Sequence, residues 1–309
     1  MSRLRVVALL AVLVGGVAAT AYGTIAATNE LTYPKAAVLG VVEGITEFLP
    51  ISSTGHLVIA EQLLGIGQTP ETKTATDTYT IAIQIGAIFG VLLIFWRRCI
   101  SVVNGLLGRD PDGRRTLIAL VVAFAPAAVI GKLFDKPIQN HLLSAGPVAA
   151  AWIVGGLVIL LWFRHRPPDE TAKVQDVSAI TPQQALVIGI AQSLALWPGV
   201  SRSLVTIIGA LLLGVSLTAA VEFSFLLGLI TLTAATGYAL ASDGGEVIDH
   251  FGVATPLFGV LVAGIAAFAS VRWMIGWLDK RGLEVFGWYR IAAGLTVIVL
   301  ILTTSRVGA

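Results

Sequence analysis

The sequence predicts an all-α, polytopic integral membrane protein built from two inverted-topology repeats. Apolar residues make up 56% of the 309 residues, whereas charged residues make up only 12%. Soluble domains contain about 25% charged residues. The apolar runs are continuous and have the length of membrane-spanning helices, which excludes a β-barrel with its alternating strands.

The apolar runs predict seven helices, at roughly 6–26, 80–96, 116–131, 147–163, 216–238, 254–276 and 285–303. Residues 1–30 are equally consistent with a signal peptide and with an uncleaved helix. Two further apolar stretches, 36–62 and 183–215, are interrupted by polar residues, glycine and proline. We therefore expect about six core transmembrane helices, one additional N-terminal helix and two segments that do not cross the membrane.

Basic residues set the expected orientation. The positive-inside rule places four basic segments in the cytoplasm: Arg3 with Arg5, Arg97–Arg115, Arg164–Lys173 and Lys280–Arg281. The loop around Ser242–His250 is acidic, lacks Lys and Arg, and is therefore expected outside. The predicted helices agree with this placement of the basic segments only if 36–62 and 183–215 are re-entrant hairpins. They would enter from opposite sides of the membrane, as in an inverted repeat.

Sequence similarity between the two interrupted stretches supports the repeat. Val38–Glu43 aligns with Val187–Gln192, and the same spacing pairs Ser52 with Ser201. We expect an N-terminal helix or signal peptide at 1–30, a first repeat at 31–166, a cytoplasmic linker at 167–182 and a second repeat at 183–309.

The first interrupted stretch contains two glutamates, Glu43 and Glu47, spaced by four residues. On a helix this spacing puts both carboxylates on one face, where like charges repel. An acidic side chain at membrane depth costs roughly 2.5–3.5 kcal/mol. Such a pair is expected to share a proton, bind a cation or face an arginine. The alternative, two solvated glutamates at a helix end, is disfavoured by the apolar residues on both sides.

A proline and a run of hydroxyl residues follow the glutamates. Pro50 ends the first half-helix, and Ser52–Gly55 offers hydroxyls and backbone N–H groups before a second half-helix that is expected to begin near Leu57. Free N–H groups at a helix start bind anions. His56 titrates near neutrality and could activate a neighbouring serine for attack on phosphorus, although a lone histidine is also commonly a capping or packing residue.

The second interrupted stretch, Trp197–Ser203, repeats this pattern with a cation. Arg202 is the single Lys or Arg between residues 174 and 271, and a guanidinium suits bidentate phosphate binding. The alternative is a permanent salt bridge from Arg202 to Glu43 or Glu47. Together, the two stretches predict one composite site for a lipid phosphate or diphosphate.

At these residues the sequence resembles the bacterial undecaprenyl-diphosphatase family, also called bacitracin-resistance proteins (BacA/UppP type). The resemblance extends from about Tyr33 to the C-terminus. It rests on Glu43-x-x-x-Glu47-Phe-Leu-Pro-x-Ser-Ser-Thr-Gly-His56 and Pro198-Gly-x-Ser-Arg-Ser203, supported by Gln84-Ile-Gly, Glu222-Phe-Ser-Phe-Leu-Leu227 and Tyr289-Arg290. The chain departs from the family in its helix at 6–26 and in Thr231, where a proline is common.

The resemblance implies removal of the terminal phosphate from undecaprenyl diphosphate. This reaction regenerates the monophosphate carrier used in cell-wall synthesis. The site is expected to open to the outer face of the bacterial inner (plasma) membrane, with Mg²⁺ or Ca²⁺ as a divalent cation.

The same resemblance implies roles for individual residues. Ser53 is the expected nucleophile and His56 its proton-transfer partner. Glu43 and Glu47 are the expected cation ligands or acid/base groups, and Arg202 contacts the phosphates. Further phosphate contacts are expected from Ser52, Thr54, Gly55, Gln192, Gly199, Ser201 and Ser203. Whether Ser53 or water attacks the phosphorus is left open.

The expected partners are a polyprenyl diphosphate and membrane lipids, and a homodimer is left open. Nucleic acid is excluded because the net charge is only +2 and the basic residues are scattered. The single Cys99 excludes an internal disulfide, and no zinc framework is present. Acid-phosphatase-like lipid phosphatases need a histidine shortly after Ser-Arg, which is missing here. A lipid-carrier flippase or anion transporter is the remaining alternative, since such proteins also use inverted repeats with broken helices.

Overall fold

The computed structural model describes residues 31–142, 144–164, 171–278 and 281–303. The described part is helical apart from its turns and an isolated parallel bridge between Val174 and Val215. The helices are α2 Tyr33–Thr46, α3 Ser53–Leu64, α4 Pro70–Ala82, α5 Gln84–Ile94, α6 Trp96–Leu106, α7 Pro111–Leu142, α8 Ala145–Arg164, η2 Val177–Ala179, α9 Pro182–Gln192, η3 Ser193–Leu196, α10 Arg202–Leu212, α11 Leu217–Phe251, α12 Ala254–Leu278 and α13 Glu284–Thr303.

Six helical segments in the described residues are long and apolar enough to cross a membrane. They are Pro70–Ile94, Pro111–Phe134, Ala145–Trp162, Leu217–Phe251, Ala254–Leu278 and Glu284–Thr303. The first combines α4 and α5, which are separated only at Ile83. The predicted all-α, polytopic membrane protein with about six core helices is therefore confirmed. The predicted helix at 6–26 lies outside the described residues.

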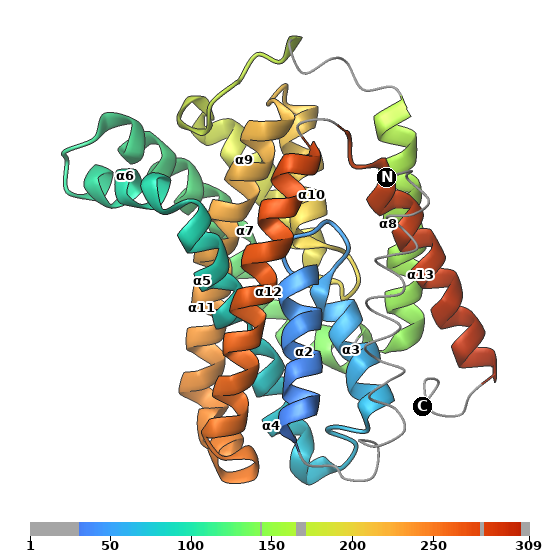
Figure 1. The fold of residues 1–309 in the computed structure, drawn as a ribbon. Coiled ribbons are helices and arrows are strands. Elements are labelled where there is room, and N and C mark those ends of the chain that lie inside the picture. The colour runs from blue at the N-terminus through green and yellow to red at the C-terminus, as the bar shows by residue number, and fades with distance from the viewer. Residues whose placement is uncertain (1–30, 143, 165–170, 279–280, 304–309) are drawn as a thin grey trace.

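Two broken helical hairpins lie inside the bundle. α2 packs on α3, and α9 packs on α10. Figure 1 shows the first hairpin reaching its turn from the lower end of the bundle, near α4, and the second reaching its turn from the upper end, near the linker. α2 lies along α12, and α9 lies along α7. In an inverted repeat, each hairpin is expected to pack along the equivalent long helix of its own or the other half, as α2 and α9 do here. The repeat itself and its boundaries stay predictions.

Three predicted boundaries are wrong. The expected loop at Arg97–Arg115 contains α6 and the start of α7. The expected outer loop around Ser242–His250 belongs to α11, because the chain turns only at Gly252, whose φ is 68°. The second half-helix of the first hairpin begins at Ser53 rather than near Leu57, because the turn is made at Ser52. The hydroxyl residues that follow Ser52 therefore lie in the first turn of α3.

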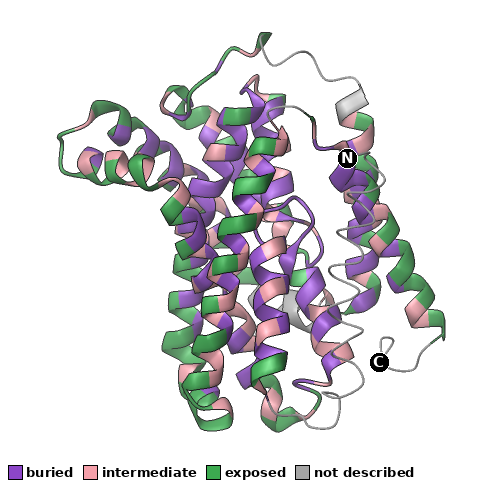
Figure 2. Ribbon diagram, in the orientation of Figure 1, coloured by how far each residue is buried: buried purple, intermediate pink, exposed green. Residues whose placement is uncertain are grey.

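The outer surface of the bundle carries large apolar side chains, as expected for contact with lipid. Leu161 on α8 and Ile265 on α12 are each 65% exposed. Figure 2 shows buried residues concentrated where helices face one another, with exposed residues along the outward faces. Polar and charged side chains such as Glu43, His56 and Arg290 are instead buried inside. The interior of the bundle therefore holds polar and charged groups, whereas its outward faces carry large apolar side chains.

Glycines bring α2 and α12 close together beside the first hairpin. A Cβ on Gly44 would lie 2.6 Å from Ala266 Cβ and would also collide with the Ala263 carbonyl oxygen. A Cβ on Gly40 would lie 2.6 Å from the Gly259 carbonyl oxygen. Small residues allow this close backbone approach between membrane helices. This contact fixes the position of α2, and hence of the carboxylates at its end.

We expect Gly44→Val to destabilise the protein by about 1–3 kcal/mol, because the added side chain overlaps the backbone of α12. The measurement is the midpoint of thermal unfolding in detergent. Gly237→Val is the matched control, since a Cβ at this exposed helical glycine meets no atom within 4 Å. Equal midpoints for the two variants would contradict the close packing of α2 on α12.

Candidate active site

The end of α2 places two carboxylates inside the bundle. Glu43 is fully buried, and neither of its carboxylate oxygens has a hydrogen-bond partner among the described residues. Glu47 lies one helical turn later, at the C-cap of α2, and is 7% exposed. Glu43 is thus a buried acidic group without a hydrogen-bond partner among the described residues. Glu47, in contrast, is held by neighbours from both hairpins.

The turn after α2 contains a strained residue. Ser52 has φ 72° and ψ 104°, and it is the one non-glycine residue with positive φ in the described part of the chain. Its carbonyl oxygen accepts a hydrogen bond from His56 Nδ1 at 2.7 Å. No side chain caps the start of α3 within the described structure. The N–H groups of the first turn of α3 therefore remain available to an anion.

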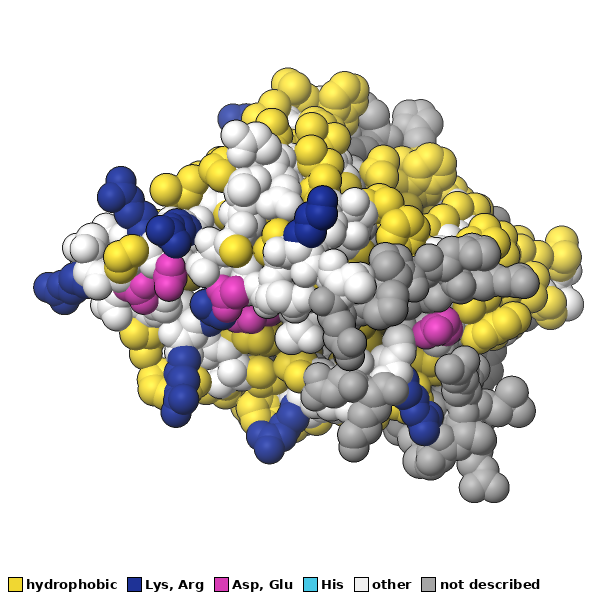
Figure 3. Space-filling model, turned by 90° about the horizontal axis from the view of Figure 1, so that it is seen from above, with side chains coloured by type: hydrophobic (Ala, Val, Ile, Leu, Met, Phe, Trp, Pro, Cys, Tyr) yellow, Lys and Arg dark blue, Asp and Glu magenta, His cyan; other side chains and the backbone are white. Residues whose placement is uncertain are grey.

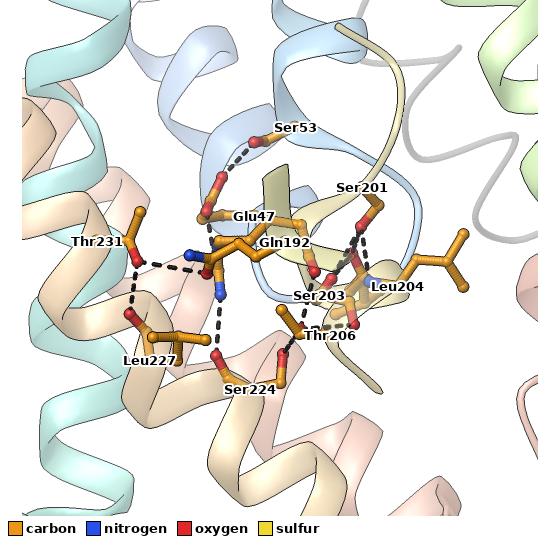
Figure 4. A network of polar contacts seen from close by, with 12 residues as sticks. Glu47, Ser53, Gln192, Ser201, Ser203, Leu204, Thr206, Ser224, Leu227 and Thr231 are labelled. Carbon is orange, nitrogen blue, oxygen red and sulfur yellow. Dashed lines mark hydrogen bonds and ion pairs between the residues drawn. The ribbon is translucent and has the colours of Figure 1, made fainter. Parts of the chain in front are cut away.

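The hydroxyl of Ser53 donates a hydrogen bond to Glu47 Oε2 (Figure 4). Both residues come from the first hairpin, on opposite sides of its turn. A carboxylate that accepts from a serine hydroxyl is positioned to remove its proton. The geometry thus pairs Ser53 with Glu47, whereas the sequence predicted a pairing with His56.

His56 is held by aromatic residues from two other helices. Its Nδ1 must carry a proton to donate to the Ser52 carbonyl, and its Nε2 lies 2.7 Å from the Tyr289 hydroxyl. The ring lies 4.4 Å from that of Trp152 and stacks on Tyr289. Both ring nitrogens are thereby engaged. In this arrangement His56 fixes the turn at Ser52 rather than contacting Ser53.

Arg202, at the start of α10, reaches from the second hairpin to the first. Its Nη2 forms an ion pair with Glu47 Oε1 at 3.2 Å, and its Nη1 donates to the Ser224 carbonyl at 2.9 Å. Its Nε is buried without a partner among the described atoms. The guanidinium also lies 5.4 Å from the Phe48 ring centroid. The salt bridge to Glu47, which the sequence offered as an alternative, is therefore present, and the Nε of Arg202 takes no part in it.

Two serines of the second hairpin bind the first hairpin directly. Ser203 Oγ donates to the Leu49 carbonyl at 3.0 Å, and Ser201 Oγ lies 2.9 Å from Ser203 Oγ (Figure 4). Ser201 also caps α10 by accepting from the Leu204 N–H. Gly199, with φ 90°, makes the preceding turn. These contacts hold the two turns against each other at the point where neither is helical.

A cavity of about 160 Å³ lies between the two turns. Seven of the predicted site residues line it: Glu47, Ser52, Ser53, Thr54, Gln192, Ser201 and Arg202. The other predicted residues, Glu43, Gly55, His56, Gly199 and Ser203, are not among its described lining. Gln84 and Thr231 also line the cavity, and the sequence analysis did not assign them to the site. The Thr231 hydroxyl lies 3.4 Å from Gln192 Oε1.

Arg290, which the sequence marks only as part of a motif, joins the two turns. Its side chain is fully buried on α13. Its Nη1 donates to the Pro50 carbonyl at 3.3 Å, and its Nη2 donates to the Gly199 and Ala151 carbonyls at 2.9 Å each. A buried cation in an apolar helix is a signal for such a role, because its charge is costly there. One guanidinium thus satisfies carbonyl groups of both breaks.

The fold and the cavity define a polytopic membrane protein with a charged, polar site enclosed between two broken hairpins. The chain belongs to the bacitracin resistance protein BacA family, whose model matches residues 36–296. It is 48% identical over 264 residues to undecaprenyl-diphosphatase 2 of Rhodospirillum rubrum, covering 85% of this chain and 93% of that protein. It is 46% identical over 269 residues to the undecaprenyl-diphosphatase of Sorangium cellulosum, covering 86% and 85% respectively. The family predicted from the sequence motifs is therefore confirmed.

We expect Ser52→Gly to be more stable than Ser52→Ala by about 1 kcal/mol. Both variants lose the hydroxyl, but only glycine adopts the positive φ of this turn without a steric cost. The measurement is the difference between their thermal unfolding midpoints in detergent. An alanine variant as stable as the glycine variant would show that the turn is unstrained.

We expect Arg290→Lys to lower the free energy of unfolding by roughly 2–3 kcal/mol, although the charge is kept. A single ammonium cannot reach the carbonyls of both turns, and each buried carbonyl left without a donor costs about 1–3 kcal/mol. Unfolding in denaturant measures the change. Arg115→Lys, at a largely exposed arginine, is the control and is expected to be neutral. An Arg290→Lys variant of wild-type stability would contradict this role.

Proposed function

We propose that the protein hydrolyses undecaprenyl diphosphate to undecaprenyl phosphate and inorganic phosphate, which recycles the lipid carrier for cell-wall synthesis. Membership of the BacA family and the similarity to proteins named undecaprenyl-diphosphatase support this reaction. The observation that carries the proposal is the linked set Ser53, Glu47 and Arg202 at one cavity. It combines a nucleophile, a base and a phosphate-binding cation inside an apolar bundle, where a lipid diphosphate can reach it.

In the proposed mechanism, Ser53 Oγ attacks the terminal phosphorus while Glu47 accepts the hydroxyl proton. The bond from phosphorus to the bridging oxygen breaks, undecaprenyl phosphate leaves, and a phosphoserine remains. Undecaprenyl phosphate takes the proton from Glu47 as it leaves. Water then attacks the phosphoserine phosphorus, Glu47 accepts the water proton and passes it to Ser53 Oγ, and inorganic phosphate is released. The contact between Ser53 and Glu47 supports this assignment of the base. Direct attack by water, with Ser53 as a hydrogen-bond donor, is the competing route.

Positive charge and N–H groups surround the proposed phosphate position. The unpartnered Nε of Arg202 is free to bind a phosphate oxygen while Nη1 stays on Ser224. The first turn of α3, including Thr54 and Gly55, contributes backbone N–H groups. Gln192 adds an amide on the opposite wall. We propose that Ser201 and Ser203 act mainly by holding the two turns together, since their hydroxyls already bond to each other and to Leu49.

A divalent cation, Mg²⁺ or Ca²⁺, fits the two carboxylates. Glu43 presents two buried oxygens without partners, and Glu47 lies one turn away. Mg²⁺ is commonly held by one or two carboxylates together with substrate phosphates. Among the described residues no group of three or more His, Cys, Asp or Glu side chains could hold a metal ion, so substrate oxygens would have to complete the proposed site. When bound, the cation would offset the negative charge of the diphosphate.

We further propose that the protein lies in the bacterial inner membrane with its site opening to the extracytoplasmic side. The hairpin α2 and α3 begins and ends at the face opposite the basic linker, which supports this orientation (Figure 1). All residues proposed for the reaction come from one chain.

The test of the proposed function is phosphate release by the purified protein in detergent with an isoprenyl diphosphate as substrate. We expect release to stop on chelation and to return with Mg²⁺ or Ca²⁺, because the carboxylates of Glu43 and Glu47 otherwise repel the diphosphate. Arg202→Ala is the inactive control. Absence of phosphate release under every metal condition would favour a lipid-carrier flippase or anion transporter on the same fold.

The base can be identified with substrate labelled in its terminal phosphate and a rapid acid quench. If Glu47 accepts the proton, Glu47→Gln should slow formation of labelled protein by about 10²–10⁴-fold, whereas His56→Gln should still form it. Ser53→Ala should form none, and unfolding midpoints control for folding of the variants.

Two outcomes would change the mechanism. Loss of labelling in His56→Gln but not in Glu47→Gln would restore the pairing of Ser53 with His56 that the sequence predicted. Unlabelled protein in every sample, with Ser53→Ala only about 10²–10³-fold slower, would establish direct attack by water.

A further inference from the structure

The helix α6 projects sideways from the bundle. Figure 1 shows α6 and the segment after it extending from the upper part of the bundle, roughly across the direction of the long helices. We call α6 and the first turns of α7, residues 96–115, the lateral hairpin. α6 packs on α7 through Gly105 and Gly113, where a Cβ would collide with the facing backbone. The hairpin is therefore a compact element rather than a loose loop.

Polar contacts fix both ends of the lateral hairpin. Arg98 binds Glu222 on α11 at 2.7 Å and Asp176 in the linker at 2.9 Å. At the turn, Asp110 accepts from the Gly113 N–H at 2.9 Å and from the Ser101 hydroxyl at 2.6 Å. These hydrogen bonds hold the pKa of Asp110 below its usual range, so it stays ionised at neutral pH. The two ion pairs of Arg98 thus set the direction in which the hairpin leaves the bundle.

The free face of α6 is apolar. Trp96, Ile100, Val103 and Leu107 recur at helical spacing on one side and are 46–58% exposed. The opposite side, which includes Gly105, faces α7. A surface helix in water would have the reverse pattern, with polar residues outward. An apolar ridge on a helix that runs across the bundle axis is typical of a helix in the membrane interface.

Basic side chains flank this apolar ridge. Arg97, Arg109 and Arg114 are exposed, and Arg115 is partly offset by Asp112 at 3.3 Å. Seen from above, the projecting part carries Lys and Arg side chains around its edge, with apolar side chains and some Asp and Glu side chains between them (Figure 3). A cavity of about 570 Å³ at the base of the hairpin is lined by Ile94, Phe95, Trp96, Arg97, Arg98, Ser101 and Glu222. The Glu222 carboxylate is paired with Arg98 at 2.7 Å, which leaves Arg97 as the cation without a carboxylate partner among the described lining. Cationic, hydroxyl and aromatic groups thus meet beside an apolar surface.

We propose that the lateral hairpin binds anionic phospholipid, with its apolar ridge among the acyl chains and Arg97, Arg109 and Arg114 on the headgroup phosphates. The cavity at its base accepts a headgroup beside Arg97. Arginines near an anionic leaflet each favour binding about fivefold. The basic charge and the apolar ridge together select an anionic lipid over a neutral lipid or a water-facing partner. This site is separate from the proposed catalytic cavity.

The test uses a fluorophore on a single engineered cysteine, which is feasible because Cys99 is the one cysteine of the chain. In a Cys99→Ala background, Val103→Cys is labelled and the full-length protein is reconstituted into vesicles. The vesicles contain brominated phosphatidylglycerol or brominated phosphatidylcholine at equal mole fraction. Gln183→Cys, at an exposed polar position on α9, is the control. Phosphate release by each labelled protein confirms that it is folded.

We expect quenching at position 103 by both lipids, with at least about fivefold preference for phosphatidylglycerol, and little quenching at position 183. The ratio of quenching by phosphatidylglycerol to quenching by phosphatidylcholine should fall toward one at high salt. It should also fall toward one in the triple variant Arg97→Gln/Arg109→Gln/Arg114→Gln, whose phosphate release should remain unchanged. Equal quenching by both lipids in the wild-type background would overturn recognition of the anionic headgroup. Quenching at position 103 by aqueous iodide instead of lipid would overturn lipid binding altogether. Disulfide-linked dimers of the unlabelled Val103→Cys protein would overturn it as well.

Discussion

Backbone groups that leave a helix inside a membrane need hydrogen-bond partners from the protein, because lipid offers none. Two such breaks face each other here, and Arg290 donates to carbonyls of both, at Pro50 and Gly199. Ser203 adds a bond to Leu49. The breaks can therefore exist only together, each supplying part of the environment of the other. The cavity between them is a consequence of this mutual support.

Charge balance at the cavity follows from the same arrangement. Glu47 is tied to Arg202 across the two hairpins and to Ser53 within one, so its charge is held where a serine proton can be removed. Glu43 has no described partner and is the natural place for a cation or a proton. The strained Ser52, anchored by His56, keeps the first turn of α3 aimed at the same point.

The outer surface of the bundle is suited to contact with lipid rather than water. Apolar side chains cover the long helices, while the lateral hairpin combines an apolar ridge with arginines. Arg98 links this hairpin to α11 and to the linker between the two halves. The same helix α11 supplies the Ser224 carbonyl that holds Arg202. Membrane contact and site geometry therefore share one supporting helix.

The sequence alone determined the membrane-spanning class, because the length of an apolar run is a local property. It also determined the two breaks and the residue types gathered there, because proline, glycine and a rare charge within an apolar run are local signals too. It also identified the family through its motifs. Only the tertiary structure decided which groups meet. His56 pairs with Tyr289 and Arg290 spans both turns because these contacts join residues far apart in the chain. Ser53 faces Glu47 because the positive φ of Ser52 starts α3 earlier than the residue pattern predicts, a conformation that a serine does not signal.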